Sequence, residues 1–205
     1  NEWAEKVGPE NVRLIMHTDP TDQQGQNIET MLHELNALDG RIQVSKVKVD
    51  AKDLAIFYNM ADCTINISDA EGFGLATLES LACGTPIIVN MTGGLQEQVT
   101  DGTKWFGVGI EPCSKAVIGS QQVPFIYEDR ISKEDFHAAL DKIYNMSKEE
   151  RETMGDLGSK HVEKNYNFKN LTNEWVKTMD EIHEKYGSWE NRKGYDRWTM
   201  TEVKL

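Results

Sequence analysis

Hydrophobic positions between residues 12 and 89 follow two alternating spacings along the chain. Short apolar runs bounded by polar or turn-forming residues predict strands. These runs lie at 12–15, 42–49, 63–67 and 87–89, the second being interrupted after Val44. Apolar residues that recur every three or four positions predict helices, at 28–38, 54–61 and 75–83. Strands that alternate with helices are typical of an α/β fold, here a Rossmann-like parallel sheet flanked by helices.

The hydrophobic pattern is weaker after residue 93, and predicted helices follow this weaker region. Glycine and proline residues divide the apolar stretches between 93 and 127, which predicts loops and short strands there. Ser132 and Ser147 each stand three residues before an acidic residue, the spacing of a helix-start capping box. Apolar residues from 171 to 182 predict a long amphipathic helix. The polar tail, which we expect to lie across another surface, contains Trp189, Tyr195 and Trp198.

The composition limits the classes of partner. The 205 residues include 22 Lys and Arg against 34 Asp and Glu, which gives a net charge of −12. This acidic balance argues against a nucleic-acid partner, because nucleic-acid affinity depends on clustered Lys and Arg. It also disfavours contact with an anionic membrane surface. No apolar run approaches the roughly 20 residues of a membrane-spanning helix.

Cysteine and histidine positions indicate neither a disulfide framework nor a metal site. The three cysteines, at 63, 83 and 113, are odd in number and far apart, which favours a reducing, cytoplasmic setting. None of the five histidines pairs with another at ligand spacing. We therefore predict no metal site.

The candidate chemistry lies in the segment Glu71-Gly72-Phe73-Gly74-Leu75-Ala76-Thr77-Leu78-Glu79. It follows a predicted strand and opens a predicted helix, and the carboxyl ends of parallel strands are where open α/β sheets bind ligands. Gly72 and Gly74 allow the backbone to approach a ligand closely, and free N–H groups at the helix start suit a diphosphate. Glu79, roughly 7 Å along the helix, can accept two ribose hydroxyls. Glu71 would then face the group beyond the phosphates.

A plainer interpretation of this segment competes with the first. A strand, turn and helix with two glycines is common packing, in which Glu79 is merely a solvated helix residue. The segment is not the dinucleotide-binding fingerprint, because Thr77 occupies the third glycine position. The spacing alone leaves both interpretations open.

The same segment resembles the E-x7-E signature of retaining GT-B glycosyltransferases, particularly those of family 4. Its two acidic residues are Glu71 and Glu79. Further similarity lies at Ser68, Asp53-Leu54 and Ala61-Asp62, from Glu79 to Val89, and from Gly93 to Glu97. The resemblance is strong from Asn11 to Gly102, whereas the later helices match only in pattern.

The resemblance implies that this chain is the donor-binding half of a GT-B enzyme. Such an enzyme transfers a sugar, of hexosyl type, from a nucleotide-diphosphate sugar to an acceptor with retention, and it needs no metal ion or cofactor. The protein stabilises the departing diphosphate and an oxocarbenium-like sugar. In this sequence, Glu79 would bind the ribose and Glu71, as the catalytic residue, a hydroxyl of the donor sugar. The remaining implied contacts are Gly72, Phe73, Gly74 and Leu75 for the diphosphate and sugar, and Lys46 and Val47 beside the base.

Two features of that family are missing from this sequence. The Arg and Lys pair that neutralises the diphosphate has no counterpart before Asn11, and there is no acceptor-binding N-terminal domain. We therefore expect residues 1–130 to form the donor-binding domain without its first, central strand, with residues 1–8 as the end of the helix after that strand. Residues 131–205 are expected to pack on this domain or on the absent one. We expect the isolated chain to be inactive.

Two other functions compete with sugar transfer. One is a non-catalytic module that binds a nucleotide sugar and acts as a regulator or scaffold. The other is a GT-B sugar-nucleotide epimerase, although the E-x7-E spacing favours transfer over epimerisation. An acceptor domain and an Arg/Lys loop upstream of Asn1 would distinguish an enzyme from a binding module.

Overall fold

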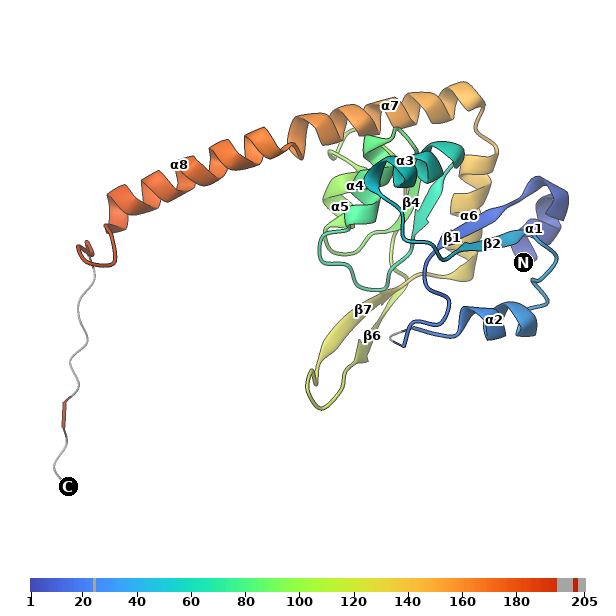
Figure 1. Ribbon diagram of the computed structural model, residues 1–205, viewed down its shortest axis with the longest axis horizontal. Helices are drawn as coiled ribbons and strands as arrows, with labels where there is room; N and C mark the ends of the chain where they lie inside the picture. Colours follow the sequence, from blue (N-terminus) through green and yellow to red (C-terminus); the bar gives the residue numbers. More distant parts are fainter. Residues whose placement is uncertain (24, 195–200, 203–205) are drawn as a thin grey trace.

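Strands and helices alternate along the first half of the computed structural model, which describes residues 1–23, 25–194 and 201–202 (Figure 1). The first elements are α1 (Glu2–Val7), the 3-10 helix η1 (Pro9–Asn11), β1 (Leu14–His17), α2 (Ile28–Glu34), β2 (Ile42–Ser45) and α3 (Ala51–Met60). They are followed by β3 (Thr64–Asn66), α4 (Leu75–Ala82), β4 (Ile87–Asn90), α5 (Leu95–Val99) and β5 (Val108–Ile110). The last elements are β6 (Ser114–Ile118), β7 (Ile126–Arg130), α6 (Lys133–Tyr144), α7 (Lys148–Asn165) and α8 (Phe168–Tyr186).

The parallel strands of the described chain form two separate sheets. β1 pairs with β2 in one sheet, and β4 lies between β3 and β5 in the other. β6 and β7 form an antiparallel hairpin, which projects away from the parallel strands in Figure 1. The predicted fold class, a Rossmann-like α/β arrangement with a helical C-terminal part, is confirmed.

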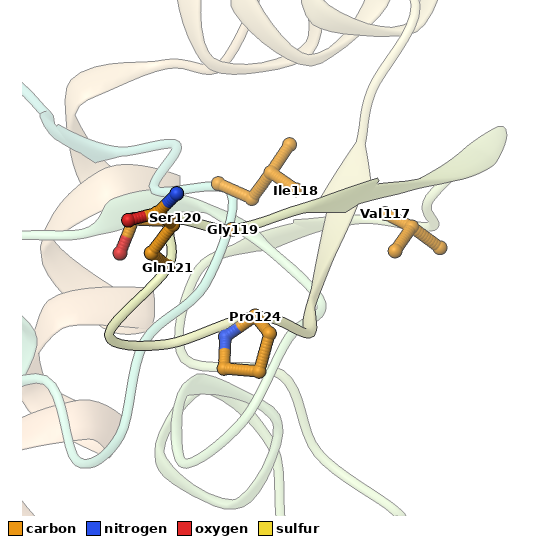
Figure 2. Close-up of a pocket in the computed structure, with 6 residues that line it drawn as sticks. All are labelled: Val117, Ile118, Gly119, Ser120, Gln121 and Pro124. Atoms are coloured by element: carbon orange, nitrogen blue, oxygen red, sulfur yellow. The ribbon is translucent and has the colours of Figure 1, made fainter.

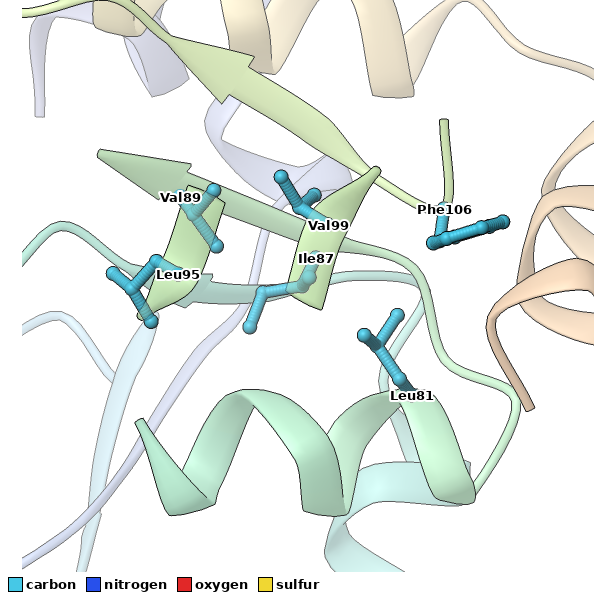
Figure 3. Packing of buried hydrophobic residues seen from close by; sticks show 6 residues of the cluster. All are labelled: Leu81, Ile87, Val89, Leu95, Val99 and Phe106. Atoms are coloured by element: carbon cyan, nitrogen blue, oxygen red, sulfur yellow. The ribbon is translucent and has the colours of Figure 1, made fainter. Parts of the chain in front are cut away.

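The core lies on both faces of β4, whose four residues are all buried. Successive side chains of a strand point to opposite faces, so Ile88 belongs to one cluster and its neighbours Ile87 and Val89 to another. The cluster in Figure 3 comprises Leu81, Ile87, Val89, Leu95, Val99 and Phe106. The opposite cluster comprises Ile88, Val108, Ile110, Ala139 and Ile143. Because both faces are covered, this strand appears in the sequence as an unbroken apolar run.

Several predicted helix boundaries are confirmed. α4 ends at Ala82, and Gly84 follows with a φ of 75°, the left-handed conformation expected after a helix. Ser147 and Glu150 form a full capping box at the start of α7. Ser132 accepts a hydrogen bond from the backbone N–H of Asp135, but the Asp135 carboxylate contacts the Ser132 hydroxyl instead of closing the box.

Two predicted elements differ from the structure, and one helix of the structure has no predicted counterpart. α2 ends at Glu34, before the expected end near residue 38, because Asn36 takes a left-handed conformation with a φ of 51°. The expected strand after Val47 is absent, since residues 46–50 lead into α3, which the Asp50 side chain caps. α5 was not predicted, because five residues are too few to show a helical period.

The last helix leaves the body of the molecule. α8 extends away from the sheets in Figure 1, and none of its residues is buried. Its exposed apolar side chains are Phe168, Leu171, Trp175, Val176, Met179, Ile182 and Tyr186. Beyond it Trp189 is exposed, whereas Tyr195 and Trp198, which belong to the predicted arm, lie outside the described residues. Within residues 1–23, 25–194 and 201–202, no helix is long and apolar enough to cross a membrane.

Two leucine-to-alanine variants should separate core packing from the exposed face of α8. Leu81 is 0% exposed and Leu171 is 53% exposed. Leu81→Ala leaves a cavity and should lower the free energy of unfolding by about 2–5 kcal/mol. Leu171→Ala removes the same atoms from an exposed face and should change it by less than about 0.5 kcal/mol. Denaturant unfolding of both variants measures the contrast, and equal losses would contradict this description of the core.

Candidate functional site

The loop of residues 71–74 connects the region after β3 to the first turn of α4. Gly74 is the N-cap of α4 and has a φ of 87°, in the left-handed region that favours glycine. A Cβ at Gly74 would lie 2.5 Å from Cδ2 of Leu95, so the position also has no space for a side chain. The sequence therefore fixes a sharp entry into the helix at this point.

The turn formed by Gly93 and Gly94 packs against the loop of residues 71–74. A Cβ on Gly93 would overlap the carbonyl oxygen of Glu71, and one on Gly94 would lie 2.7 Å from the carbonyl oxygen of Phe73. The Gly94 N–H donates to the carbonyl oxygen of Gly72 over 3.3 Å. The backbone of the Gly93–Gly94 turn is thus in direct contact with the backbone of residues 71–74. This contact fixes the position of the loop relative to the sheet.

Gln98 of α5 is a third support for the loop, and the sequence analysis did not select it. Its side chain is 1% exposed, and its Nε2 donates to the carbonyl oxygen of Phe73. Its Oε1 is buried without a hydrogen-bond partner among the described residues, so the Nε2 bond alone offsets the cost of burying this amide. No local spacing distinguishes this glutamine from Gln96, so only the fold could reveal its contact.

The first turn of α4 presents backbone N–H groups to the outside. No side chain caps this helix, and Gly74 O accepts hydrogen bonds from the N–H groups of Thr77 and Leu78. The preceding N–H groups, of Leu75 and Ala76, have no acceptor within the helix, as at any helix start. Phe73 and Leu75 are exposed beside them. This end of the helix can therefore bind an anion, which the helix dipole also favours.

Glu79 lies about 7 Å along α4 from Gly74, on an exposed part of the helix. The hydroxyl of Tyr58, from α3, donates to Glu79 Oε2 over 2.8 Å. Burial and this hydrogen bond raise the pKa of Tyr58, so the phenol keeps its proton and remains a donor. Tyr58 thus contacts Oε2 of Glu79 and not Oε1.

Glu71 lies at the other end of the segment and is half-buried. Its carbonyl oxygen lies against Gly93. A Cβ added at Gly74 would lie 3.5 Å from Cγ of Glu71. Along the chain, the two carboxylates of the motif therefore stand before and after the exposed amides of α4. Gly72 between them is exposed.

A buried polar network supports this edge of the sheet. Asn66, at the end of β3, donates to Thr77 Oγ1 of α4 over 3.1 Å. Asn90, at the end of β4, donates to the carbonyl oxygens of Ser68 and Asp129, each over 2.9 Å. The network ties the carboxyl ends of two parallel strands to the base of the β6–β7 hairpin. Sequence reasoning missed it because its members lie far apart in the chain.

The predicted base-binding residues lie in another part of the fold. Lys46 and Val47 follow β2, which belongs to the other parallel sheet. Lys46 Nζ forms an ion pair with Glu29 of α2 over 2.6 Å, and Val47 is exposed. These contacts connect Lys46 to α2 rather than to residues 71–79, so its role toward a base stays a prediction.

A separate hollow lies at the turn of the β6–β7 hairpin (Figure 2). It is lined by Val117, Ile118, Gly119, Ser120, Gln121 and Pro124, none of which is charged. The opposite end of the hairpin reaches the loop after β3, where Arg130 Nη1 and Asp69 Oδ2 are 2.6 Å apart. The hollow is therefore not the anion-binding end of α4. In the part of the chain that the structure describes, no cluster of three or more His, Cys, Asp or Glu could hold a metal ion.

Sequence comparison places these residues in a known family. The family model described as glycosyl transferases group 1 matches residues 23–161. A D-inositol 3-phosphate glycosyltransferase of Paenarthrobacter aurescens is 31% identical over 115 residues, which cover 56% of this chain and 23% of that protein. One from Thermomonospora curvata is 49% identical over 66 residues, or 32% of this chain and 15% of that protein. The chain spans less than a quarter of the length of these relatives.

Solved structures share the fold. A sucrose-phosphate synthase from Thermosynechococcus elongatus superimposes with a TM-score of 0.63 at 18% identity, over 89% of this chain and 49% of that one. A glycosyltransferase from Rickettsia africae gives 0.66 at 17% identity, over 88% and 42%. Anabaena HepE, solved in complex with UDP-glucose, gives 0.64 at 15% identity, over 87% and 43%. At these identities the likeness concerns the fold alone.

Replacing Gln98 by Met should loosen the loop that opens α4. The variant keeps the volume of the side chain but leaves the Phe73 carbonyl oxygen without its donor, which should cost about 1–3 kcal/mol of unfolding free energy. Gln96→Met, in the same helix but exposed, is the matched control and should have little effect. Thermal melts of both variants measure this, and unchanged stability of Gln98→Met would show that the hydrogen bond does not support the loop.

Proposed function

The chain belongs to the family of glycosyl transferases group 1, and on that premise we propose that it is the donor-binding part of a retaining glycosyltransferase. The donor would be a nucleotide-diphosphate sugar. The observation that carries the proposal is the uncapped start of α4 between the carboxylates of Glu71 and Glu79. Amides that bind anions, next to a carboxylate that binds hydroxyls, match a diphosphate next to a ribose.

In this proposal the nucleotide lies along the first turns of α4. The backbone N–H groups of Phe73, Gly74 and Leu75 bind the diphosphate, and Gly72 allows the sugar to lie close to the backbone. Glu79 accepts the ribose hydroxyls, while Tyr58 keeps one carboxylate oxygen in place. Lys46 and Val47 would border the base only where the nucleotide extends as far as the loop after β2.

Glu71 acts at the sugar. When the bond between the anomeric carbon and the diphosphate oxygen breaks, positive charge develops on the sugar ring and negative charge on the leaving group. The carboxylate of Glu71 holds a sugar hydroxyl, and the amides of α4 stabilise the leaving diphosphate. The acceptor hydroxyl oxygen then bonds to the anomeric carbon on the face that the diphosphate leaves, and its proton passes to an oxygen of the leaving diphosphate, which gives retention of a hexosyl group.

The charges around the start of α4 indicate that cationic groups from elsewhere are needed to neutralise a bound diphosphate. Arg130, which contacts the loop after β3 through Asp69, is already paired with Asp69 and Glu128. Amide dipoles alone neutralise only part of a diphosphate charge. We propose that a cationic pair and the acceptor site come from a further domain or chain, so residues 1–205 alone do not transfer sugar.

The C-terminal region is proposed to bind that further domain. Residues 131–205 include α8, in which no apolar side chain is buried. An apolar helix face of this length is typical of a contact surface. The matched part of the chain covers 23% of one curated relative and 49% of one solved structure. Residues 1–130 would then form the donor-binding domain.

A cytoplasmic location is part of the proposal. All three cysteines, Cys63, Cys83 and Cys113, are free thiols in the structure. Free, separated thiols are typical of proteins in a reducing compartment. Burial raises the pKa of Cys63 to about 12, so this thiol is also unreactive.

Glu79→Ala and Glu71→Ala should weaken the binding of different ligands. If Glu79 accepts ribose hydroxyls, its loss should weaken binding of a bare nucleoside diphosphate roughly ten- to a hundredfold. Glu71→Ala should leave that affinity nearly unchanged and weaken only the nucleotide sugar. Calorimetric titration with UDP, GDP and their glucose or mannose conjugates tests this, after melts establish that the variants fold.

Glu163→Ala, an exposed carboxylate of α7, is the matched control and should bind as the unchanged chain does. Equal losses for both ligands in both variants would contradict the assignment of ribose and sugar. Unchanged binding in both would support the plainer interpretation, in which the two carboxylates are only solvated.

Nucleoside diphosphate binding should not depend on a divalent cation. The amides of α4 supply the donors for the diphosphate, so no metal bridge is needed. Calorimetry with UDP and GDP in the presence of EDTA, and then of excess magnesium, should give affinities within about threefold. Strict dependence on magnesium would overturn the proposed mode of diphosphate binding.

A further inference from the structure

Two contacts hold the backbone on either side of Glu71. On its carboxyl side, the carbonyl oxygen of Glu71 lies directly against Gly93 of the turn after β4. On its amino side, the backbone N–H of Asp129 in β7 donates to the carbonyl oxygen of Asp69 over 2.7 Å. Ala70 is the only residue between Asp69 and Glu71. The position of Glu71 is therefore set by β7 as well as by the turn after β4.

An ion pair strengthens the contact between β7 and Asp69. Arg130 Nη1 lies 2.6 Å from Asp69 Oδ2, and Nη2 of the same guanidinium contacts the carboxylate of Glu128. A guanidinium is planar and donates in fixed directions, so it holds the two carboxylates in one arrangement. The side chains of Asp69 and Arg130 are 38% and 44% exposed. Both can therefore be replaced without leaving a cavity in the core.

The residues on either side of Arg130 are fixed to the core of the sheet. Ile131 packs against the buried cluster on one face of β4. Asn90 Nδ2, at the end of β4, donates to the carbonyl oxygen of Asp129 over 2.9 Å, and Thr92 Oγ1 donates to Asp129 Oδ2 over 2.7 Å. Arg130 thus contacts Asp69 from a rigid support, which is the condition for holding a neighbouring group precisely in place.

Glu79, the other carboxylate of the motif, has a different support. It lies on α4, and its Oε2 accepts the hydrogen bond from Tyr58 of α3. The contacts from β7 reach the loop before Glu71, whereas the contact from α3 reaches Glu79. A change at β7 can therefore displace one carboxylate and leave the other in place.

We propose that Arg130 and Asp69 are positioning residues for the donor sugar. Their ion pair holds the loop so that the carboxylate of Glu71 lies within hydrogen-bond distance of a sugar hydroxyl. The inference rests on the proposed function, in which Glu71 binds the sugar. A hydroxyl and a carboxylate need an oxygen–oxygen distance of about 2.5–3.0 Å, so a loop shift of about 1 Å breaks their hydrogen bond. The β6–β7 hairpin thereby sets the affinity for the sugar through Glu71.

The test measures a ratio of two dissociation constants, that of a bare nucleoside diphosphate divided by that of its sugar conjugate. Calorimetry with UDP and UDP-glucose, and with GDP and GDP-mannose, gives this ratio for the 205-residue chain. Arg130→Met removes the charge and the donors but keeps an unbranched side chain, and it should lower the ratio about three- to tenfold. Asp69→Ala should lower it to a similar extent. In both variants the affinity for the bare nucleoside diphosphate should stay within about twofold.

Two further variants distinguish positioning from a general effect on the fold. In a chain that already carries Glu71→Ala, Arg130→Met should change the ratio no further, because the carboxylate that it positions is gone. The double variant Asp69→Arg/Arg130→Asp again places one guanidinium between two carboxylates. It should recover most of the ratio that either single exchange loses.

Arg151→Met is the matched control. Arg151 forms an ion pair with Asp62 over 3.1 Å, just before the amino end of β3 and thus at the opposite end of that strand from Asp69. Its loss should leave the ratio unchanged, even where it lowers the melting temperature. Thermal melts establish that each variant is folded before titration.

The outcomes separate this inference from the proposed function. A lowered ratio in Glu71→Ala, with an unchanged ratio in Arg130→Met and Asp69→Ala, would overturn the positioning role and leave the proposed function standing. An unchanged ratio in Glu71→Ala would overturn the proposed function and this inference together. Losses from Arg130→Met that are equal with and without Glu71 would show that Arg130 does not act through this carboxylate. An equal loss in Arg151→Met would indicate a general loosening of the fold, which also contradicts the inference.

Discussion

The backbone of the Gly93–Gly94 turn lies against the backbone of residues 71–74 without space for a side chain between them. This contact joins the loops that follow two neighbouring parallel strands, β3 and β4. It sets the direction in which α4 begins, so the amides of its first turn are exposed. Gln98 reinforces the contact from the core side through the Phe73 carbonyl oxygen. The position of Glu79 follows, since it is fixed to the same rigid helix.

The contact stands at a boundary between a well-packed and an open part of the molecule. On one side, β4 is buried on both faces by α4, α5 and α6. On the other side, β1 and β3 each have one edge without a pairing strand among the described residues, and Ile15 and Ile65 are exposed. The amide-rich end of α4 is thus held by a rigid core.

The segment from β3 to β4 was predictable from sequence because its signals are local. Two glycines, an amphipathic run and Gly84 after it define a loop, a helix and its end within a few residues. The predicted end of α2 was wrong. Leu35 and Leu38 continue the apolar period, although Asn36 already has a left-handed conformation outside the helix. Gln98 and the network of Asn66, Thr77 and Asn90 could not be predicted, since their partners lie far away in the chain. The roles of Glu71 and Glu79 stay predictions.

Amide chemical shifts provide the most direct measurement of where a nucleotide binds. In a titration of the isotope-labelled chain with UDP and with GDP, the account predicts that the largest shifts fall on the amides of Phe73 to Ala76 and on those flanking Glu79. Smaller changes should reach Gln98 through the loop contact. Shifts confined to the hairpin turn at residues 117–124, or no shifts at millimolar nucleotide, would contradict a donor site at the start of α4.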